Sequence, residues 1–183
     1  MKRLVVYIWL AALCGLPAEA QKPPEHRNAL YVGSATQDRV VREVRHELVT
    51  LSSFGIFDNL AFSVSAGAVT LYGQVTRPAL RGDAENAVRR IEGVTRVANQ
   101  IRVLPLSEAD DRIRLAAFHA IFGDPALKCY AMQAVPPIHI VVDNGKVTLV
   151  GVVLSESDRT LAGTRANAVP GVFSVNNDLK VEH

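Results

Sequence analysis

The sequence predicts an α+β protein made of two tandem modules with the same fold. The first observation is a repeated phrase: residues 69–75 read VTLYGQV and residues 147–153 read VTLVGVV, with five of seven letters identical. The second is that the match continues without gaps at the same offset, which carries Gly67 to Gly145 and Val103 to Val181. The third is the order of apolar spacings in each copy, which alternates between helical and strand periodicity.

The repeat also predicts the boundaries of the modules. Upstream of the hairpin the offset becomes shorter, so that His46 matches His119. The second copy therefore holds five extra residues, which we place within residues 124–137. We predict module 1 at residues 38–103, a linker at residues 104–110 and module 2 at residues 111–183.

Each module is expected to run helix, strand, strand, helix, strand. In module 1 a helical stripe follows Asp38, a candidate N-cap, and apolar residues alternate in residues 60–64 and 69–75. A second helix begins at Pro78 and is expected to end at Gly93, and residues 97–103 alternate as the last strand. The pattern predicts a three-stranded mixed sheet with two helices on one face.

Module 2 repeats these signals with its own local chemistry. Asn144-Gly145 is a strong hairpin signal because both residues tolerate a positive φ. Ser155 and Asp158 form a candidate capping pair for the second helix, and Gly171 is expected to end it.

A glycine interrupts the same strand of each module, at Gly73 and Gly151. Glycine inside a strand is costly unless the strand bends or another group approaches closely. We favour a structural interpretation, in which a helix or a neighbouring backbone packs there. The alternative is a slot for a ligand. We treat Gly73, Gly93, Gly151 and Gly171 as structural glycines.

The N-terminus predicts export to the periplasm. Residues 1–20 combine a basic start, a short apolar stretch and a small-residue cleavage site, as in a cleavable signal peptide. An uncleaved anchor and a lipoprotein acylated at Cys14 are the alternatives, but Leu13 is bulky where a lipobox has a small residue. Residues 21–37 are polar and are interpreted as a flexible tether.

The charge distribution argues against a nucleic-acid partner and leaves two interpretations. Without the signal peptide the net charge is +1, which is not the basic footprint of a nucleic-acid-binding protein. Residues 38–103 carry a net charge of +2 and residues 108–183 carry −2. Either the two modules dock on each other within the chain, or the arginine-rich module faces anionic lipid.

The repeated motif resembles the BON domain, a family named after bacterial osmotically inducible and nodulation proteins. The resemblance rests on G-x-V-T-L-x-G-x-V at residues 67–75, and on G-V-x-x-V-x-N-x-[IL]-x-V at residues 93–103, with both motifs repeated in module 2. It implies a helix–strand–strand–helix–strand fold, a periplasmic or envelope location, no enzymatic activity and no cofactor. It also implies a role in osmotic or envelope stress, with weak binding to phospholipid or to an envelope protein.

Two groups of residues are candidates for such a contact. Arginines on or beside the second helix of module 1 could face anionic lipid, and apolar residues near the five-residue insertion could add an apolar contact. These are Arg77, Arg81, Arg89, Arg90 and Arg96, followed by Phe122, Leu127 and Tyr130. The alternative for the apolar group is packing over an open edge or between modules, because the equivalent loop of module 1 also carries Phe54, Ile56 and Phe57.

The sequence contains no motif for catalysis or for a metal. The histidines are scattered, and neither HExxH, paired CxxC nor GxSxG occurs. Cys129 has no counterpart in module 1 and is interpreted as a bystander. We therefore predict a protein that is not an enzyme.

Overall fold

The computed structural model describes residues 35–133 and 136–182. The predicted signal peptide, Cys14 and most of the predicted tether lie outside these residues, so the structure does not test those predictions. Residues 35–37, which we assigned to the tether, belong to the first helix. Among the described helices, none is long and apolar enough to span a bilayer.

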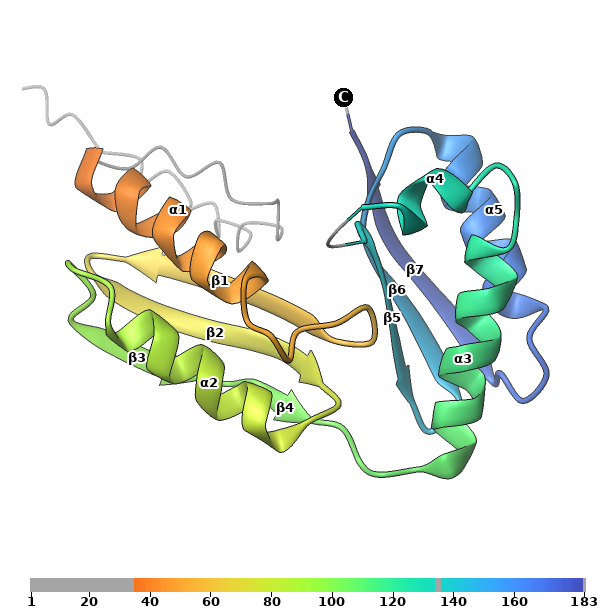
Figure 1. The fold of residues 1–183 in the computed structure, drawn as a ribbon, viewed down its shortest axis with the longest axis horizontal. Coiled ribbons are helices and arrows are strands. Elements are labelled where there is room, and N and C mark those ends of the chain that lie inside the picture. The colour runs from red at the N-terminus through yellow and green to blue at the C-terminus, as the bar shows by residue number, and fades with distance from the viewer. Residues whose placement is uncertain (1–34, 134–135, 183) are drawn as a thin grey trace, which may run out of the picture. The chain divides into compact units, whose positions relative to one another are not determined.

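Module 1 has the predicted order of elements, with its last strand divided in two (Figure 1). Strand β2 lies at the centre, paired antiparallel with β1 and parallel with β3 and β4. The elements are α1 (Ala35–Val49), β1 (Asn59–Ser65), β2 (Ala68–Val75), α2 (Pro78–Arg89), β3 (Arg96–Asn99) and β4 (Arg102–Val103).

Module 2 repeats this topology with one additional helix, α4, in the region of the predicted insertion. Its sheet has the order β5-β6-β7, with β5 antiparallel and β7 parallel to the central β6. The elements are α3 (Glu108–Phe122), α4 (Lys128–Ala131), β5 (Ile138–Asp143), β6 (Lys146–Val153), α5 (Glu156–Asn167) and β7 (Ser174–Val181).

The strand registers follow the offset found in the sequence. Val69 pairs with Val97 in module 1, and their counterparts Val147 and Val175 pair in module 2. A shift of one residue would turn every apolar side chain of a strand to the opposite face, so this agreement shows that the apolar pattern sets the register in both modules.

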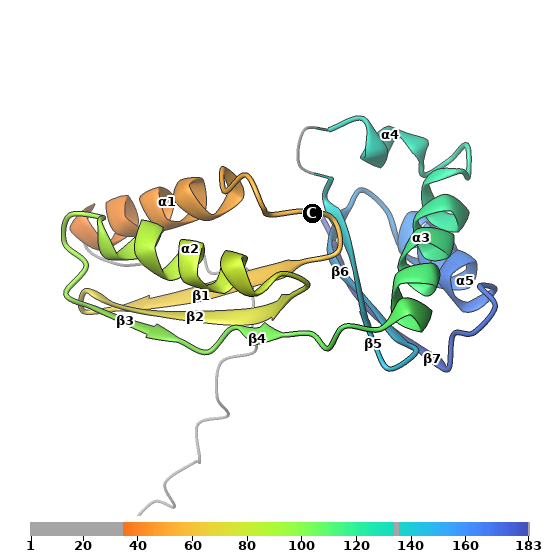
Figure 2. The same ribbon diagram turned by 60° about the horizontal axis from the view of Figure 1, so that its bottom comes forward.

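Each module has its own hydrophobic core, because both helices cover one face of its sheet (Figure 2). On β2 the inward side chains of Val69, Leu71 and Val75 are at most 1% exposed, and they alternate with partly exposed Thr70 and Gln74. The helices bury their apolar stripes against these side chains. Burial of each large aliphatic side chain contributes about 1.5–3 kcal/mol.

Helix termini correct three details of the sequence prediction. Helix α1 begins at Ala35, so Asp38 lies in its first turn and is not the N-cap. Helices α2 and α5 end at the C-caps Arg90 and Ala168, which have right-handed backbone angles, so Gly93 and Gly171 are not their C′ residues. Both glycines lie a few residues later, at φ of +91° and +89°, where the chain turns toward the last strand.

The capping pair of module 2 is present. The Ser155 hydroxyl accepts a hydrogen bond of 3.1 Å from the backbone N–H of Asp158. Pro78 occupies the first turn of α2, where its missing N–H costs nothing.

The strand glycines are required by a close approach of backbone. Gly73 and Gly151 have φ of +121° and +134°, in a region that other residues rarely adopt. A Cβ on Gly73 would overlap the carbonyl group of Asn59, and one on Gly151 would overlap that of Pro137. The structure therefore places a neighbouring backbone, and not a ligand, against both positions.

A repeated asparagine joins the second helix of each module to the last strand. The Asn99 side chain donates to the Arg81 carbonyl at 2.9 Å, and Asn177 donates to the Arg159 carbonyl at 2.7 Å. Each asparagine also accepts from the backbone N–H of the residue two positions later in the chain. The asparagine of the repeated motif therefore has a structural role in both modules.

Candidate lipid or partner surface

Helix α2 and its N-cap carry three of the candidate arginines. Arg81 and Arg89 are exposed and lie about 80° apart around the helix axis, and exposed Arg77 is the N-cap directly before the first turn. Glu85 lies between them and pairs with Arg89. We call Arg77, Arg81 and Arg89 the arginine stripe. It carries positive charge with one acidic residue, Glu85, among the arginines.

Arg90 belongs to a different surface. It lines a groove of about 830 Å³ between α1 and α2. Arg39 is the other arginine of the groove, and it already contacts Glu43 at 2.9 Å and Glu92 at 3.6 Å. Four carboxylates line the groove against two arginines, so Arg90 lies in a mixed environment that does not favour an anionic surface. The four are Glu43, Glu47, Asp83 and Glu92.

Arg96 lies on the other face of the sheet. It is the first residue of β3, and Val97 after it packs against the core under the helices. Because side chains alternate along a strand, Arg96 projects away from α2. The five candidate arginines therefore do not form one surface, and only the arginine stripe groups several of them.

The apolar candidates of module 2 are part of its core. Phe122, Leu127 and Tyr130 are 6%, 0% and 3% exposed. The segment after α3 folds back through α4 and covers the core, with Asp124 paired to Arg165 of α5 at 2.7 Å. These three residues therefore pack, as the alternative interpretation expects, and they are not available to a lipid surface.

Tyr130 also joins α4 to the start of α5. Its hydroxyl donates to Asp158 at 2.8 Å and accepts from the Leu154 N–H at 2.8 Å. Burial raises the pKa of the Tyr130 phenol above its ordinary value, while the hydrogen bond from the Leu154 N–H acts in the opposite direction.

Module 2 has three strongly exposed apolar side chains, of which the sequence analysis missed Phe173 and Leu154. Phe173 is 79% exposed, Met132 is 82% exposed and Leu154 is 65% exposed. Phe173 lies between α5 and β7, and its N–H donates to the Gly145 carbonyl of the β5–β6 turn at 2.8 Å. The offset between the two copies aligns Phe173 with Thr95. The aromatic residue at a position that is polar in module 1 could therefore have identified Phe173 as an exposed candidate from the sequence.

The loop after α1, residues 51–58, also contacts β5. The Ile140 N–H donates to the Ile56 carbonyl at 2.8 Å, and Ile56 and Phe57 pack against the core of module 2. The Phe54 ring stacks on the His139 ring with 5.2 Å between centroids. The aromatic residues of this loop are thus packed, and they are not free to bind a surface.

His139 has an altered protonation equilibrium at this contact. Burial lowers the pKa of His139 below its ordinary value, and the Gly55 carbonyl and the Asp58 carboxylate act in the opposite direction. The Gly55 carbonyl lies 3.3 Å from Nδ1 of His139. Asp58 itself is buried and accepts from the Thr76 N–H at 2.7 Å, from the Thr76 hydroxyl at 2.9 Å and from the Gly55 N–H at 3.0 Å.

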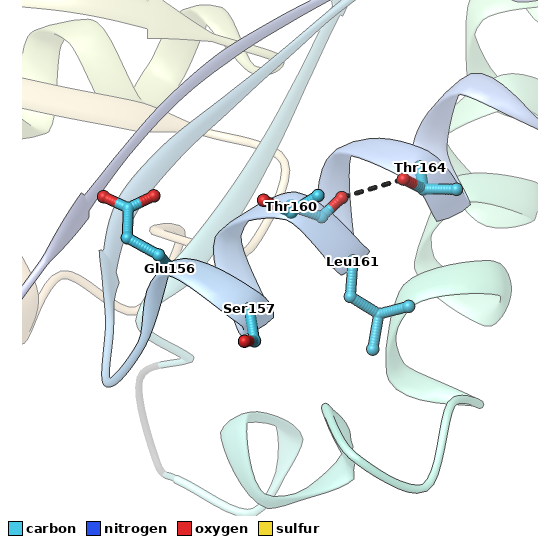
Figure 3. Close-up of a pocket in the computed structure, with 5 residues that line it drawn as sticks. All are labelled: Glu156, Ser157, Thr160, Leu161 and Thr164. Carbon is cyan, nitrogen blue, oxygen red and sulfur yellow. Dashed lines mark hydrogen bonds between the residues drawn. The ribbon is translucent and has the colours of Figure 1, made fainter.

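A shallow hollow on α5 offers little chemistry (Figure 3). The Thr164 hydroxyl in it donates to the carbonyl of Thr160 at 2.9 Å, one turn earlier. The other lining residues are Glu156, Ser157 and Leu161. One carboxylate and three hydroxyls on a single helix make no arrangement for a nucleophile and its base. Within residues 35–133 and 136–182, no cluster of three or more metal-ligating side chains is present.

The fold and its surfaces define a class of protein: a tandem repeat of small αββαβ modules with charged helix faces. Residues 36–105 and 131–183 match the BON domain, and the chain belongs to the BON domain family. The resemblance seen in the repeated motif is thereby confirmed.

The chain is also similar to individual proteins. It is 34% identical over 116 residues to osmotically-inducible protein Y of Escherichia coli, and the match covers 62% of this chain and 57% of that protein. The matched part is thus a little more than half of the relative. Among solved structures, CdsD, a structural protein of the type III secretion system of Chlamydia trachomatis, has 12% identity and a TM-score of 0.29. That comparison covers 79% of this chain and 92% of the other.

Proposed function

We propose that this protein is a non-enzymatic component of the bacterial periplasm that binds anionic phospholipid weakly and reversibly under osmotic or envelope stress. The arginine stripe of α2 is the observation that carries this proposal. Membership of the BON domain family and the similarity to an osmotically inducible protein support the link to stress. The signal-peptide pattern of residues 1–20 supports the location.

The charges of the arginine stripe give only weak binding. Each arginine near an anionic bilayer contributes about 1 kcal/mol, so three contribute about 3 kcal/mol. Glu85 reduces this total because it pairs with Arg89. A free energy of about 3 kcal/mol corresponds to a dissociation constant above about 1 mM. Charge alone therefore does not hold the protein on a membrane.

An exposed aromatic residue can supply the missing free energy. Phe173 is 79% exposed and lies beside Gly145 of the β5–β6 turn. An exposed aromatic ring suits the interface of a bilayer, where it can enter the apolar region below the headgroups. A ring that enters the bilayer contributes about 1.5–3 kcal/mol.

Flotation with lipid vesicles tests this proposal. We expect binding to phosphatidylglycerol vesicles, loss of binding at high salt and no binding to phosphatidylcholine vesicles. The double variant Arg77→Ser with Arg81→Gln should weaken binding about tenfold or more. Ser at position 77 should also stabilise α2 by about 0.5–1 kcal/mol, because Arg77 is an N-cap that makes no side-chain cap. Weaker binding could then not be attributed to unfolding.

The matched control removes two other exposed arginines from module 1. Arg42 and Arg45 lie on α1 and are exposed. Their replacement by Gln removes the same charge and should change binding by less than about threefold. An equal loss in both double variants would contradict a role for the stripe. Absence of salt-sensitive binding to anionic vesicles would contradict the function itself.

A second candidate function is binding to an envelope protein. It is favoured by Met132 and Leu154, two exposed apolar residues that directly follow α4 and β6, and the Leu154 N–H donates to the Tyr130 hydroxyl of α4. A photo-crosslinking residue at position 154 should then capture a stoichiometric protein from envelope extracts, and Met132→Ser should reduce the yield. Crosslinks to lipid alone would argue for the first function.

A further inference from the structure

The outer edges of the two sheets differ in how they are covered. Strands β1 and β5 are equivalent, and within residues 35–133 and 136–182 each pairs with a neighbouring strand on one side only. In an antiparallel pair, alternate residues direct their N–H and C=O groups outward. Counting from the two-residue turns, these are Leu60, Phe62 and Val64 in β1, with Ile138, Ile140 and Val142 at the same positions in β5.

The edge of β5 is protected by groups of the same chain. The Ile140 N–H donates to the Ile56 carbonyl at 2.8 Å, and the buried Arg114 guanidinium donates to the Val142 carbonyl at 2.7 Å. Ile140 itself is 0% exposed and belongs to the core of module 2. Uncovered edges invite pairing with another strand, and this protection prevents it.

The edge of β1 has only part of this protection. The Gln37 side chain donates to the Val64 carbonyl at 3.0 Å, at the position where Arg114 contacts Val142 in module 2. Among the residues that the structure describes, no hydrogen bond joins the outward backbone groups of Leu60 or Phe62 to a partner. Phe62 is partly exposed, whereas its counterpart Ile140 is fully buried.

Strand β1 also lacks the features that usually prevent edge pairing. Its seven residues, NLAFSVS, include no charged residue and no proline. The side chains on its outer face at Ala61, Ser63 and Ser65 are exposed and small, so another strand can approach without a clash.

The sequence of this edge indicates which strand fits it. Residues 60–64 read LAFSV, and the reverse order VSFAL has the same alternation of apolar and small residues about Phe62. An antiparallel pairing about a twofold axis at Phe62 places Leu60 opposite Val64 of the second strand. Such a contact is isologous, because the same patch serves both subunits. We infer that β1 is a strand-pairing surface for β1 of a second copy of this chain.

The expected contact is a weak dimer with one sheet continued across two copies. The twofold pairing supplies about six backbone hydrogen bonds. The Val64 carbonyl can keep its bond to Gln37, because a carbonyl oxygen has two lone pairs. The contact area is small, so association should require high concentration or accumulation on a surface.

Sedimentation of the purified, exported chain over a range of concentrations tests the inference. We expect a monomer–dimer equilibrium, with hydrogen exchange at the amides of Leu60 and Phe62 slowing as concentration rises. The double variant Ala61→Lys with Ser63→Lys places lysines opposite one another across the axis, and it should raise the dimer dissociation constant about tenfold or more.

The matched control places two lysines on another edge strand. Ser174 and Asn176 are exposed on β7, two residues apart, and Ser174→Lys with Asn176→Lys should leave dimerisation unchanged. The inference is overturned by a monomer at millimolar concentration. It is also overturned by a dimer whose β1 amides exchange as in the monomer, or by a dimer that only the β7 variant weakens. Vesicle binding is measured separately, so failure here leaves the proposed lipid function intact.

Discussion

At the scale of single residues, the interior of each module depends on a few positions that both copies share. The glycines in the central strands admit a neighbouring carbonyl, and the motif asparagines join helix to strand. Each of these residues acts through the backbone of another element. The glycines and asparagines of the repeated motif therefore stabilise the fold, and they do not indicate which ligand the protein binds.

We predict that Gly73→Ala destabilises the protein by about 2–4 kcal/mol. The added Cβ overlaps the Asn59 carbonyl, and φ of +121° is strained for alanine. Urea unfolding measures the change in the free energy of unfolding. Gly82 of α2 is the control, because its Cβ would have open space, so Gly82→Ala should stabilise by about 0.5–1 kcal/mol. Equal effects of the two substitutions would contradict the prediction.

We predict that His139 makes stability depend on pH. Its pKa is lowered in the folded protein, so below pH of about 6.5 the unfolded chain binds the proton more readily. The free energy of unfolding should therefore decrease as the pH falls below that value. In His139→Gln this decrease should be smaller, although the variant is less stable at neutral pH because its stacking with Phe54 is lost. Identical pH profiles for the two proteins would argue against this origin.

At the scale of elements, the two copies begin their second helices differently. Helix α5 begins with a hydroxyl cap at Ser155, whereas α2 begins at Arg77 without one. The first helices differ in a similar way, since Gln37 and Arg114 reach the edge strands through different donors. The fold is thus kept by the apolar pattern, while local polar contacts vary between the copies.

We predict that Ser155→Ala costs about 1 kcal/mol of stability, because the Asp158 N–H loses its partner. Ser157 lies two residues further along α5 and is exposed, and it makes no side-chain hydrogen bond among the described residues. Ser157→Ala should therefore change stability by less than about 0.5 kcal/mol. Thermal unfolding of both variants checks the difference, and a larger cost at position 157 would refute it.

The sequence predicted the elements better than their terminal and surface details. The constant offset between the copies identified both hairpins, because buried alternation fixes strands and their register. Helix α4 was not predicted, since a single turn at Lys128–Ala131 is too short to show a period. The burial of Tyr130 depends on α5, and the position of Arg90 in a groove depends on α1. Contacts between elements that are distant in the sequence cannot be predicted from the spacing of apolar residues within one element.

At the scale of the whole molecule, the opposite net charges of the two modules predict docking within the chain. Ile56 and Phe57 pack against the core of module 2, and Arg102 forms an ion pair of 2.8 Å with Asp143. Because a module of about 70 residues is marginally stable alone, such contacts would stabilise both modules.

We predict that Ile56→Ser with Phe57→Ser uncouples the unfolding of the two modules. Calorimetry should show one transition for the original chain and two for the variant, because the loop then no longer packs on module 2. Phe173→Ser is the control, since this ring is 79% exposed and its loss should leave the transition unchanged. A single transition in the double variant would contradict docking through this loop.

The Asn144-Gly145 turn has a consequence for the chemical lifetime of the protein. In an Asn-Gly pair the glycine nitrogen can attack the asparagine side-chain carbonyl, which releases ammonia and forms a succinimide ring that water then opens to aspartate or isoaspartate. Here the Asp110 carboxylate accepts from the Gly145 N–H at 2.8 Å and from the Asn144 N–H at 2.9 Å. This hydrogen bond directs the Gly145 N–H toward Asp110 and away from the Asn144 side chain. Asn144 should therefore deamidate slowly, although the hairpin requires an Asn-Gly turn.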